Sequence, residues 1–209
     1  MSNDFSDLIT AYVWTARDKG RQADIANGIW RKYGVRKAAL VVDLSGFSKR
    51  AATKDGLLEF LGVVRRMQTA ARPIVVMHGG EIVKMEADNC FAVFDRAEEA
   101  ALAAFELIDA SHAIVEFEAM DLRVCCGLEI GEILLLPDHD FFGNAVNVAS
   151  RLGEDLAKPD EVLVGRDIRA ALESAGWNAG DISRPKLPTG AGKLMRHPSA
   201  RRRVGLKRP

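Results

Sequence analysis

Residues 81–95 read EIVKMEADNCFAVFD, in which two apolar-rich runs flank the short segment Ala87-Asp88-Asn89. The runs EIVKME and CFAVFD have the length and composition of β-strands, and Asp and Asn both tolerate the backbone geometry of a tight turn. The stretch therefore predicts a β-hairpin, and a hairpin requires its two strands to pair antiparallel.

Strand-like and helix-like segments alternate on both sides of this hairpin. Short apolar runs indicate strands, apolar residues three or four positions apart indicate helices, and Pro and Gly mark their ends. The expected elements are a strand at 38–43, a helix at 55–71 that ends before Pro73, the hairpin at 81–95, a helix at 97–112, a second hairpin formed by LRVCCGLE and EILLLP around Ile130-Gly131, a helix at 143–156, a strand at 162–165 and a helix at 166–175.

The order of these elements is β-α-β-β-α-β-β-α-β-α. The two hairpins require antiparallel pairs, and each connection that contains a helix crosses one face of the sheet. We therefore expect the α+β class, with a ferredoxin-like antiparallel sheet and helices packed on it.

Two amphipathic segments precede the first expected strand. The spacing of their apolar residues predicts a helix over 4–19 that ends at Gly20 and a helix over 22–33 that ends at Gly34. Packing on the rest of the chain and contact with a second copy are both consistent with such helices. The expected divisions of the chain are an N-terminal helical arm (1–36), a central domain (37–181) and a basic, partly flexible C-terminal segment (182–209).

The composition is that of a soluble domain, because 48% of the 209 residues are hydrophobic and 28% are charged. No apolar run approaches the ~18–20 residues that span a bilayer, so we expect no membrane span. The polar, acidic N-terminus does not resemble a signal peptide, so we expect a cytoplasmic protein.

Charge is unevenly distributed although the formal net charge is zero. Residues 182–209 hold nine of the 29 basic residues and none of the 29 acidic ones. Such a segment can solubilise the chain or bind an anionic surface. No aromatic residue follows Trp177 to stack on bases, so we do not expect a nucleic-acid partner.

Two acidic residues occupy positions that a hard cation could use. Asp43 ends a strand before a Ser-Gly turn, and Asp88 lies in the turn of the 81–95 hairpin. Turn chemistry explains each residue separately. Together they can meet at one edge of a sheet, because neighbouring strands lie ~4.8 Å apart, and Mg²⁺ would remove the repulsion between the two carboxylates.

A third candidate begins at Gly143, which frees the backbone to start a helix. Asn144, Asn147 and Arg151 follow on one face of this helix, whereas its apolar residues fall on another. A solvated helix face would account for them, but two amides and a guanidinium without a nearby acid favour ligand recognition.

The stretches AALVVDLSGFS, GGEIVKMEADNCFAVF, RVCCGLEIGEIL and FFGNAVNVASRLGEDLAKPDEVLV together resemble the class III nucleotidyl cyclases, the family of adenylate and guanylate cyclases. The resemblance covers about residues 37–165. It implies a phosphorus–oxygen lyase, in which the ribose 3′-hydroxyl of a nucleoside triphosphate attacks the α-phosphorus and pyrophosphate leaves.

The resemblance also implies the residues that bind metal and phosphate. Asp43 and Asp88 are implied to hold two Mg²⁺ or Mn²⁺ ions per site, with a backbone oxygen from Leu44. The N–H groups of a turn at a helix start would cradle the triphosphate. The residues of this turn are Ser45, Gly46 and Phe47.

Four further residues are implied by the same match. Asn147 would orient the ribose, and Arg151 would stabilise charge on the α-phosphate. Lys84 and Asp140 would bind the base, and they favour adenine because lysine donates to ring N1 and aspartate accepts from the N6 amino group. The family forms head-to-tail homodimers whose two sites are each built from both subunits, and we expect the same here.

Three positions depart from the family pattern. Ala87 stands where the family usually has Gly, and Phe142 follows Phe141 to make the floor of the base pocket bulkier. The family also supplies a phosphate-binding Lys near the C-terminus, for which Lys186 and Lys193 are the candidates.

The leading hypothesis is therefore an adenylate cyclase that makes 3′,5′-cyclic AMP from ATP. One alternative is a pyrimidine nucleotide cyclase that acts on UTP or CTP, like the bacterial antiphage cyclases. Another is a non-catalytic, nucleotide-binding cyclase-like module that signals by its conformation. Retention of both acids, Asn147 and Arg151 argues against a non-catalytic module.

Overall fold

The computed structural model describes residues 4–45, 54–114, 117, 122–177, 182–183 and 192–194. Its strands are β1 Gly34–Ser45, β2 Glu81–Glu86, β3 Asn89–Phe94, β4 Arg123–Leu136, β5 Asp140–Phe142, β6 Val162–Val164, β7 Ile182–Ser183 and β8 Gly192–Leu194. Its helices are α1 Phe5–Trp14, α2 Lys19–Tyr33, α4 Lys54–Met77, α5 Ala97–His112, α7 Asn144–Ser150, the π-helix η1 Arg151–Leu156, and α8 Arg166–Ser174.

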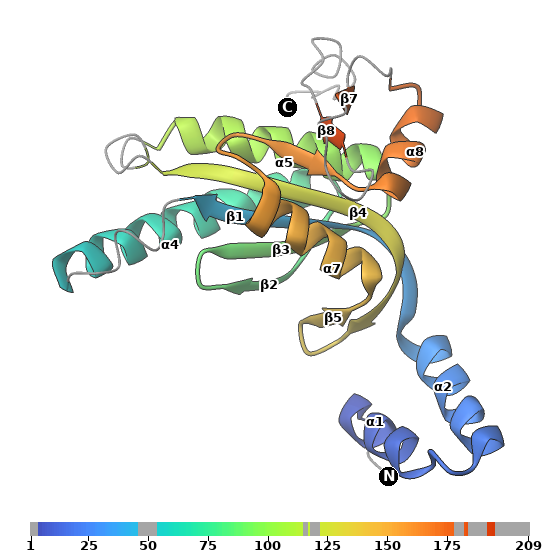
Figure 1. Ribbon diagram of the computed structural model, residues 1–209. Helices are drawn as coiled ribbons and strands as arrows, with labels where there is room; N and C mark the ends of the chain where they lie inside the picture. Colours follow the sequence, from blue (N-terminus) through green and yellow to red (C-terminus); the bar gives the residue numbers. More distant parts are fainter. Residues whose placement is uncertain are drawn as a thin grey trace.

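These eight strands of the described chain form one sheet. Their order is β2-β3-β1-β4-β6-β8-β7, and β5 pairs with β4 on the side (Figure 1). The pairing is antiparallel throughout, except that β4 and β6 run parallel. The α+β class is confirmed, and so is the predicted order of elements from β1 to α8 except at the second hairpin.

Helices cover both faces of the sheet (Figure 1). Along β1, Leu40 and Val42 pack into the core that contains α4, α5 and α8. The alternate residues Ala39 and Val41 pack into a second core with α7 and Phe141. This alternation follows from the two-residue period of a strand, and it makes β1 a central strand buried on both sides.

β4 is one continuous strand, so the predicted hairpin around Ile130-Gly131 is wrong. Nearly all of β4 pairs antiparallel with β1, from Gly34 opposite Leu134 to Ser45 opposite Arg123, and only Leu135 and Leu136 lie beyond this register. Pairing over this length outweighs the local turn signal of a single glycine. The second hairpin instead joins β4 to β5.

Two predicted helix boundaries are also wrong. Pro73 lies inside α4, where it is exposed, while Ile74 and Val75 continue the buried face of the helix beyond it. Gly20 lies inside α2, which begins after Asp18 because the carboxylate of Asp18 accepts a hydrogen bond from the Arg21 N–H.

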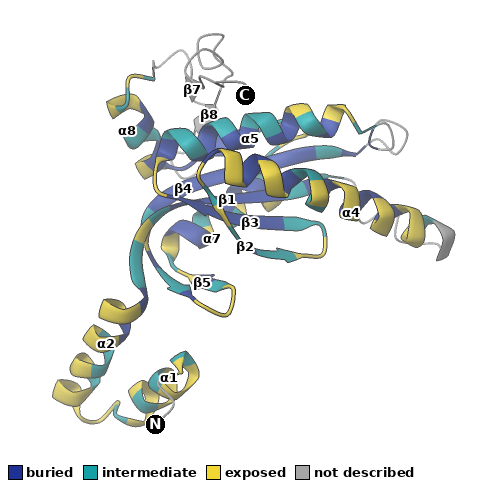
Figure 2. Ribbon diagram, turned by 180° about the vertical axis from the view of Figure 1, so that it is seen from behind, coloured by how far each residue is buried: buried dark blue, intermediate teal, exposed yellow. Residues whose placement is uncertain are grey.

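The helices α1 and α2 extend away from the sheet (Figure 2). Ile29 and Tyr33 of α2 are buried against Leu136 of β4, whereas α1 has no buried residue. None of the described helices is long and apolar enough to cross a membrane. The predicted divisions at residues 36 and 181 stay predictions.

The segment formed by α7 and η1 lies unusually close to the sheet. A Cβ added at Gly127 of β4 would lie 2.0 Å from the carbonyl oxygen of Ala149 and 2.4 Å from the backbone nitrogen of Gly153. A Cβ at Gly153 would in turn lie 2.9 Å from the carbonyl oxygen of Val41. Two glycines therefore set the separation between the π-helix and the two central strands.

This packing predicts that Gly127→Ala strongly destabilises the fold. Both opposing atoms are backbone and cannot rotate away, so we expect a loss of about 3 kcal/mol or more in the free energy of unfolding, measured by urea denaturation. Gly62→Ala is the matched control, because a Cβ there meets nothing within 4 Å and Ala is the better helix former. Equal stability of Gly127→Ala and wild type would contradict the close contact.

Candidate active site

The two acidic residues singled out in the sequence lie at the same end of adjacent strands. β1 pairs with β3 so that Val42 lies opposite Cys90. Asp43 follows Val42, and Asp88 lies in the turn just before β3 begins. The register of the sheet thus brings two carboxylates from distant parts of the chain together.

The surroundings of Asp43 and Asp88 disfavour the ionised forms of both carboxylates. Burial, together with the negative charge of Asp88, raises the pKa of Asp43 to about 6, although a hydrogen bond from the Leu44 N–H opposes the shift. Burial also raises the pKa of Asp88. The ionised forms are therefore disfavoured in the protein alone, and a divalent cation would relieve that cost.

η1 adds two acids that the sequence analysis did not single out. The charges of Glu154 and Asp155 also raise the pKa of Asp43. Burial raises the pKa of Glu154 itself, and a hydrogen bond from the Ser150 hydroxyl opposes that shift. The sequence feature that could have pointed to these two acids is the Gly-Glu-Asp run after Leu152. The π-helical turn that directs this run toward the sheet cannot be predicted from the sequence.

Asp43 and Asp88 fit hard divalent cations such as Mg²⁺ or Mn²⁺. Among the described residues, no three His, Cys, Asp or Glu side chains are placed to hold a metal ion by themselves. Mg²⁺ is commonly held by one or two carboxylates together with water and substrate phosphates. Two strand-end carboxylates match that mode of binding.

The predicted phosphate-binding turn is described only at its start. Leu44 has its side chain buried in the core, and Ser45 is the last residue of β1. Gly46 and Phe47 lie outside the described residues. Arg123 at the start of β4 is the register partner of Ser45, so a cationic residue that the sequence analysis did not single out lies beside the end of β1.

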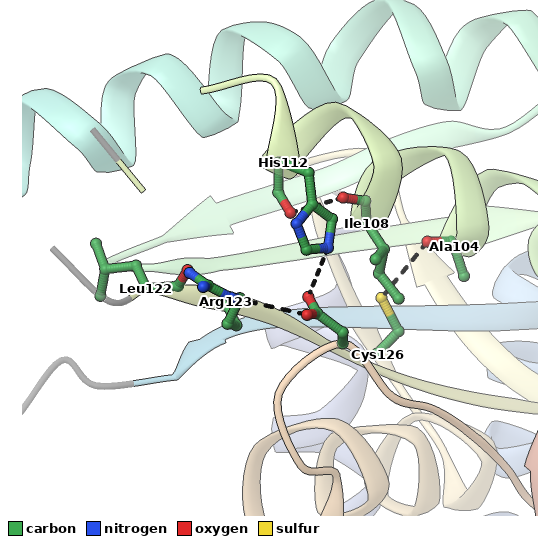
Figure 3. Close-up of polar contacts among 8 residues, drawn as sticks. Ala104, Ile108, His112, Leu122, Arg123 and Cys126 are labelled. Atoms are coloured by element: carbon green, nitrogen blue, oxygen red, sulfur yellow. Dashed lines mark hydrogen bonds and ion pairs between the residues drawn. The ribbon is translucent and has the colours of Figure 1, made fainter. Parts of the chain in front are cut away.

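Arg123 takes part in a polar cluster at this end of the sheet (Figure 3). The carboxylate of Asp160 lies 3.7 Å from Nε of Arg123 and 3.2 Å from Nε2 of His112. The cluster ties the end of α5 to the start of β4 and to the loop before β6. It borders a cavity of about 170 Å³, lined by Ser111, His112, Phe117, Leu122 and Arg123.

The two residues predicted to bind the base contact each other. Nζ of Lys84 in β2 lies 3.1 Å from Oδ1 of Asp140 in β5. The hydrogen bond from Lys84 to this carboxylate raises the lysine pKa, and the same Oδ1 accepts the Phe141 N–H. A hydrogen-bond donor and an acceptor thus lie side by side between β2 and β5.

Asn147 and Arg151 stand on the outer face of α7 and at the start of η1. Both side chains are exposed in the single chain, as is that of Asn144. All three side chains are therefore accessible on the surface of the single chain, and their predicted role in ligand recognition stays a prediction.

Ala87 adopts a backbone conformation that usually requires glycine. Its φ of 51° lies in the left-handed region. The turn of the hairpin therefore keeps the shape expected of a Gly there, at some conformational cost.

Comparisons with known proteins agree with this architecture. The chain resembles the adenylate/guanylate cyclase/hydrolase of Silicibacter pomeroyi, with 24% identity, a TM-score of 0.63, and coverage of 78% of this chain and 98% of that one. It also resembles the monomeric guanylyl cyclase domain of the RhoGC fusion protein of Blastocladiella emersonii, with 16% identity, a TM-score of 0.63, and coverage of 78% and 95%.

Curated relatives are longer proteins. An uncharacterized protein of Mycobacterium tuberculosis is 33% identical over 62% of this chain and 32% of its own length. The "Putative adenylate cyclase 3" of Rhizobium meliloti is 33% identical over 63% of this chain and 22% of its own length. The chain thus spans a third or less of these relatives, and no family model matches it.

The fold is that of the class III nucleotidyl cyclase catalytic domains. Asp43 and Asp88 lie near each other and Lys84 contacts Asp140, whereas the metal-binding and base-binding roles of these residues stay predictions.

The raised pKa of Asp43 predicts a pH-dependent gain of stability in Asp43→Asn. A folded-state pKa of about 6, above the ordinary value of 3.8, means that wild type loses stability as the pH rises from about 4 to about 6. Asn does not ionise. After discounting for solvent screening, we expect Asp43→Asn to raise Tm by about 2–4 °C at pH 7.5 in EDTA and by nothing at pH 4.

The matched control is Asp138→Asn, since Asp138 is exposed in the segment between β4 and β5. It should leave Tm unchanged at both pH values. If the Tm of Asp43→Asn were equal to or below that of wild type at pH 7.5, burial would not disfavour the ionised carboxylate of Asp43, and the prediction would be wrong.

Proposed function

We propose that the chain is a nucleotidyl cyclase that converts ATP to 3′,5′-cyclic AMP and pyrophosphate. The observation that carries the proposal is the register of β1 and β3, which sets Asp43 beside Asp88 on a class III cyclase fold. The named activities of the Silicibacter, Blastocladiella and Rhizobium proteins support nucleotide cyclisation, and both adenylate and guanylate cyclases occur among these similar proteins.

Asp43, Asp88 and the Leu44 carbonyl would hold two divalent cations. When bound, these ions lower the pKa of the attacking ribose hydroxyl and neutralise charge on the pyrophosphate that leaves. Backbone N–H groups of the Ser45–Phe47 turn would bind the triphosphate.

Asn147 and Arg151 would act on the ribose and the α-phosphate of a substrate held by a second copy. Asn147 orients the sugar so that the 3′-hydroxyl faces the α-phosphorus. Arg151 stabilises the charge that develops on the α-phosphate, an interaction stronger in the transition state than in the ground state. Their exposure in the single chain supports a head-to-tail homodimer with two shared sites.

Lys84 and Asp140 would select adenine. Lys84 donates to ring N1 and Asp140 accepts from the N6 amino group, whereas guanine presents a donor at N1 and an acceptor at O6. The 3.1 Å contact between these residues supports the assignment, because the two groups already lie side by side before a base arrives.

The proposal predicts that the purified protein turns over ATP in preference to the other three nucleoside triphosphates when Mn²⁺ is present. Asp88→Ala should lower the rate of cyclic AMP formation at least about a hundredfold, because one ligand of the cations is lost. Asp138→Ala is the control and should keep the wild-type rate. Predominant cyclic UMP or cyclic CMP would instead favour a pyrimidine cyclase, and no product from any of the four would favour a non-catalytic module.

A shared site predicts that two inactive variants complement each other. Asp88→Ala lacks a residue of one half-site and Arg151→Ala a residue of the other. An equal mixture that exchanges subunits should recover about a quarter of wild-type activity, because half of the dimers then hold one intact site of two. Mixtures as inactive as either variant alone, despite subunit exchange shown by a tagged copy, would place all the groups within one chain.

A further inference from the structure

The base-recognition residue Asp140 lies on a strand of three residues that has one strand partner. β5 pairs with β4 through Leu134, Leu135 and Leu136. So short a strand is weakly fixed by its backbone hydrogen bonds alone. Its position must depend on how its side chains pack.

The two aromatic residues that follow Asp140 anchor β5 on opposite sides. Phe141 is buried and meets Phe91 of β3 edge to face, with ring centroids 6.0 Å apart. Phe142 points the other way and stays 47% exposed. Its ring stacks on Phe5 of α1, with centroids 6.0 Å apart and planes 9° from parallel.

Phe5 is itself held by the N-terminal helices. Its ring meets Tyr33 of α2 edge to face at 5.4 Å, and Tyr33 is buried in a cluster with Leu136. Leu136 is the register partner of Asp140. Contacts therefore run from α1 and α2 to Phe142 of β5 and to Leu136, the β4 residue paired with Asp140.

We propose that Phe5 is a positioning residue for base selection, which holds β5 through Phe142 so that the Asp140 carboxylate stays in reach of Lys84. The N-terminal helices thereby belong to the specificity apparatus of the nucleotide site. This inference rests on the proposed function, because it concerns the same base pocket, and it assigns a role to a segment outside the catalytic core.

Energetics allow an effect of measurable size. A stacked aromatic pair contributes about 0.5–1.5 kcal/mol beyond the area it buries, which corresponds to a two- to tenfold change in an equilibrium constant. The loss should fall on discrimination between bases, because Phe5 lies beside the strand of Asp140 and not beside Asp43 or Asp88. Phosphate binding should be spared.

The test is equilibrium binding of 3′-deoxy-ATP and 3′-deoxy-UTP, which lack the attacking hydroxyl, with Mn²⁺ present. We expect Phe5→Ala to reduce the preference for the adenine nucleotide about three- to tenfold, while the affinity for inorganic tripolyphosphate stays unchanged. Trp14→Ala is the matched control, since Trp14 lies on the same helix with 83% of its surface exposed. Phe5→Tyr, which keeps a stacking ring, should restore the wild-type preference.

Phe5→Leu provides a second variant should Phe5→Ala fold poorly, because it keeps the apolar bulk and removes the ring. An unchanged adenine preference in a folded Phe5→Leu or Phe5→Ala protein would overturn the proposal. Equal losses for tripolyphosphate and both nucleotides would also overturn it, since they indicate general destabilisation. Failure of wild type to bind any nucleotide would instead refute the proposed function.

Discussion

Burial of two acidic side chains, Asp43 and Asp88, at the same end of adjacent strands is the constraint on which the site depends. The pairing of β1 with β3 forces two carboxylates to one edge of the sheet, and burial raises the pKa of both. A protein gains nothing in stability from such a pair. Divalent cations at the site would offset the cost of burying two ionised carboxylates. The same cost would therefore favour the binding of metal ions together with the triphosphate.

Close packing of backbone on backbone keeps the other parts of the site in place. Gly127 and Gly153 let η1 approach the central strands, and the same turn carries Glu154 toward Asp43. π-Helical turns are rare and frequently lie at functional sites. Here the π-helical turn begins at Arg151 and continues α7, which carries Asn147, so one local distortion lies between the exposed polar residues and the acidic residues Glu154 and Asp155.

Much of this architecture could be predicted from the sequence, and the errors have physical causes. The 81–95 hairpin and most of the order of elements from β1 to α8 follow from local patterns, and the structure confirms them apart from the second hairpin. The break at Gly131 was wrong because pairing with β1 decides the strand, and the helix end before Pro73 was wrong because Ile74 and Val75 continue a buried face. The approach of Glu154 and the stack of Phe5 on Phe142 depend on tertiary contacts that no local pattern reports.

The most direct measurement of the central claim is the number of Mn²⁺ ions that each chain binds in the presence of 3′-deoxy-ATP, determined by electron paramagnetic resonance. The account predicts about two ions for wild type, as in two-metal phosphoryl-transfer sites. For the double variant with alanine in place of both Asp43 and Asp88, the account predicts at most one Mn²⁺ ion per chain, which is the ion bound to the nucleotide itself. The same ion count in wild type and in this double variant would contradict it.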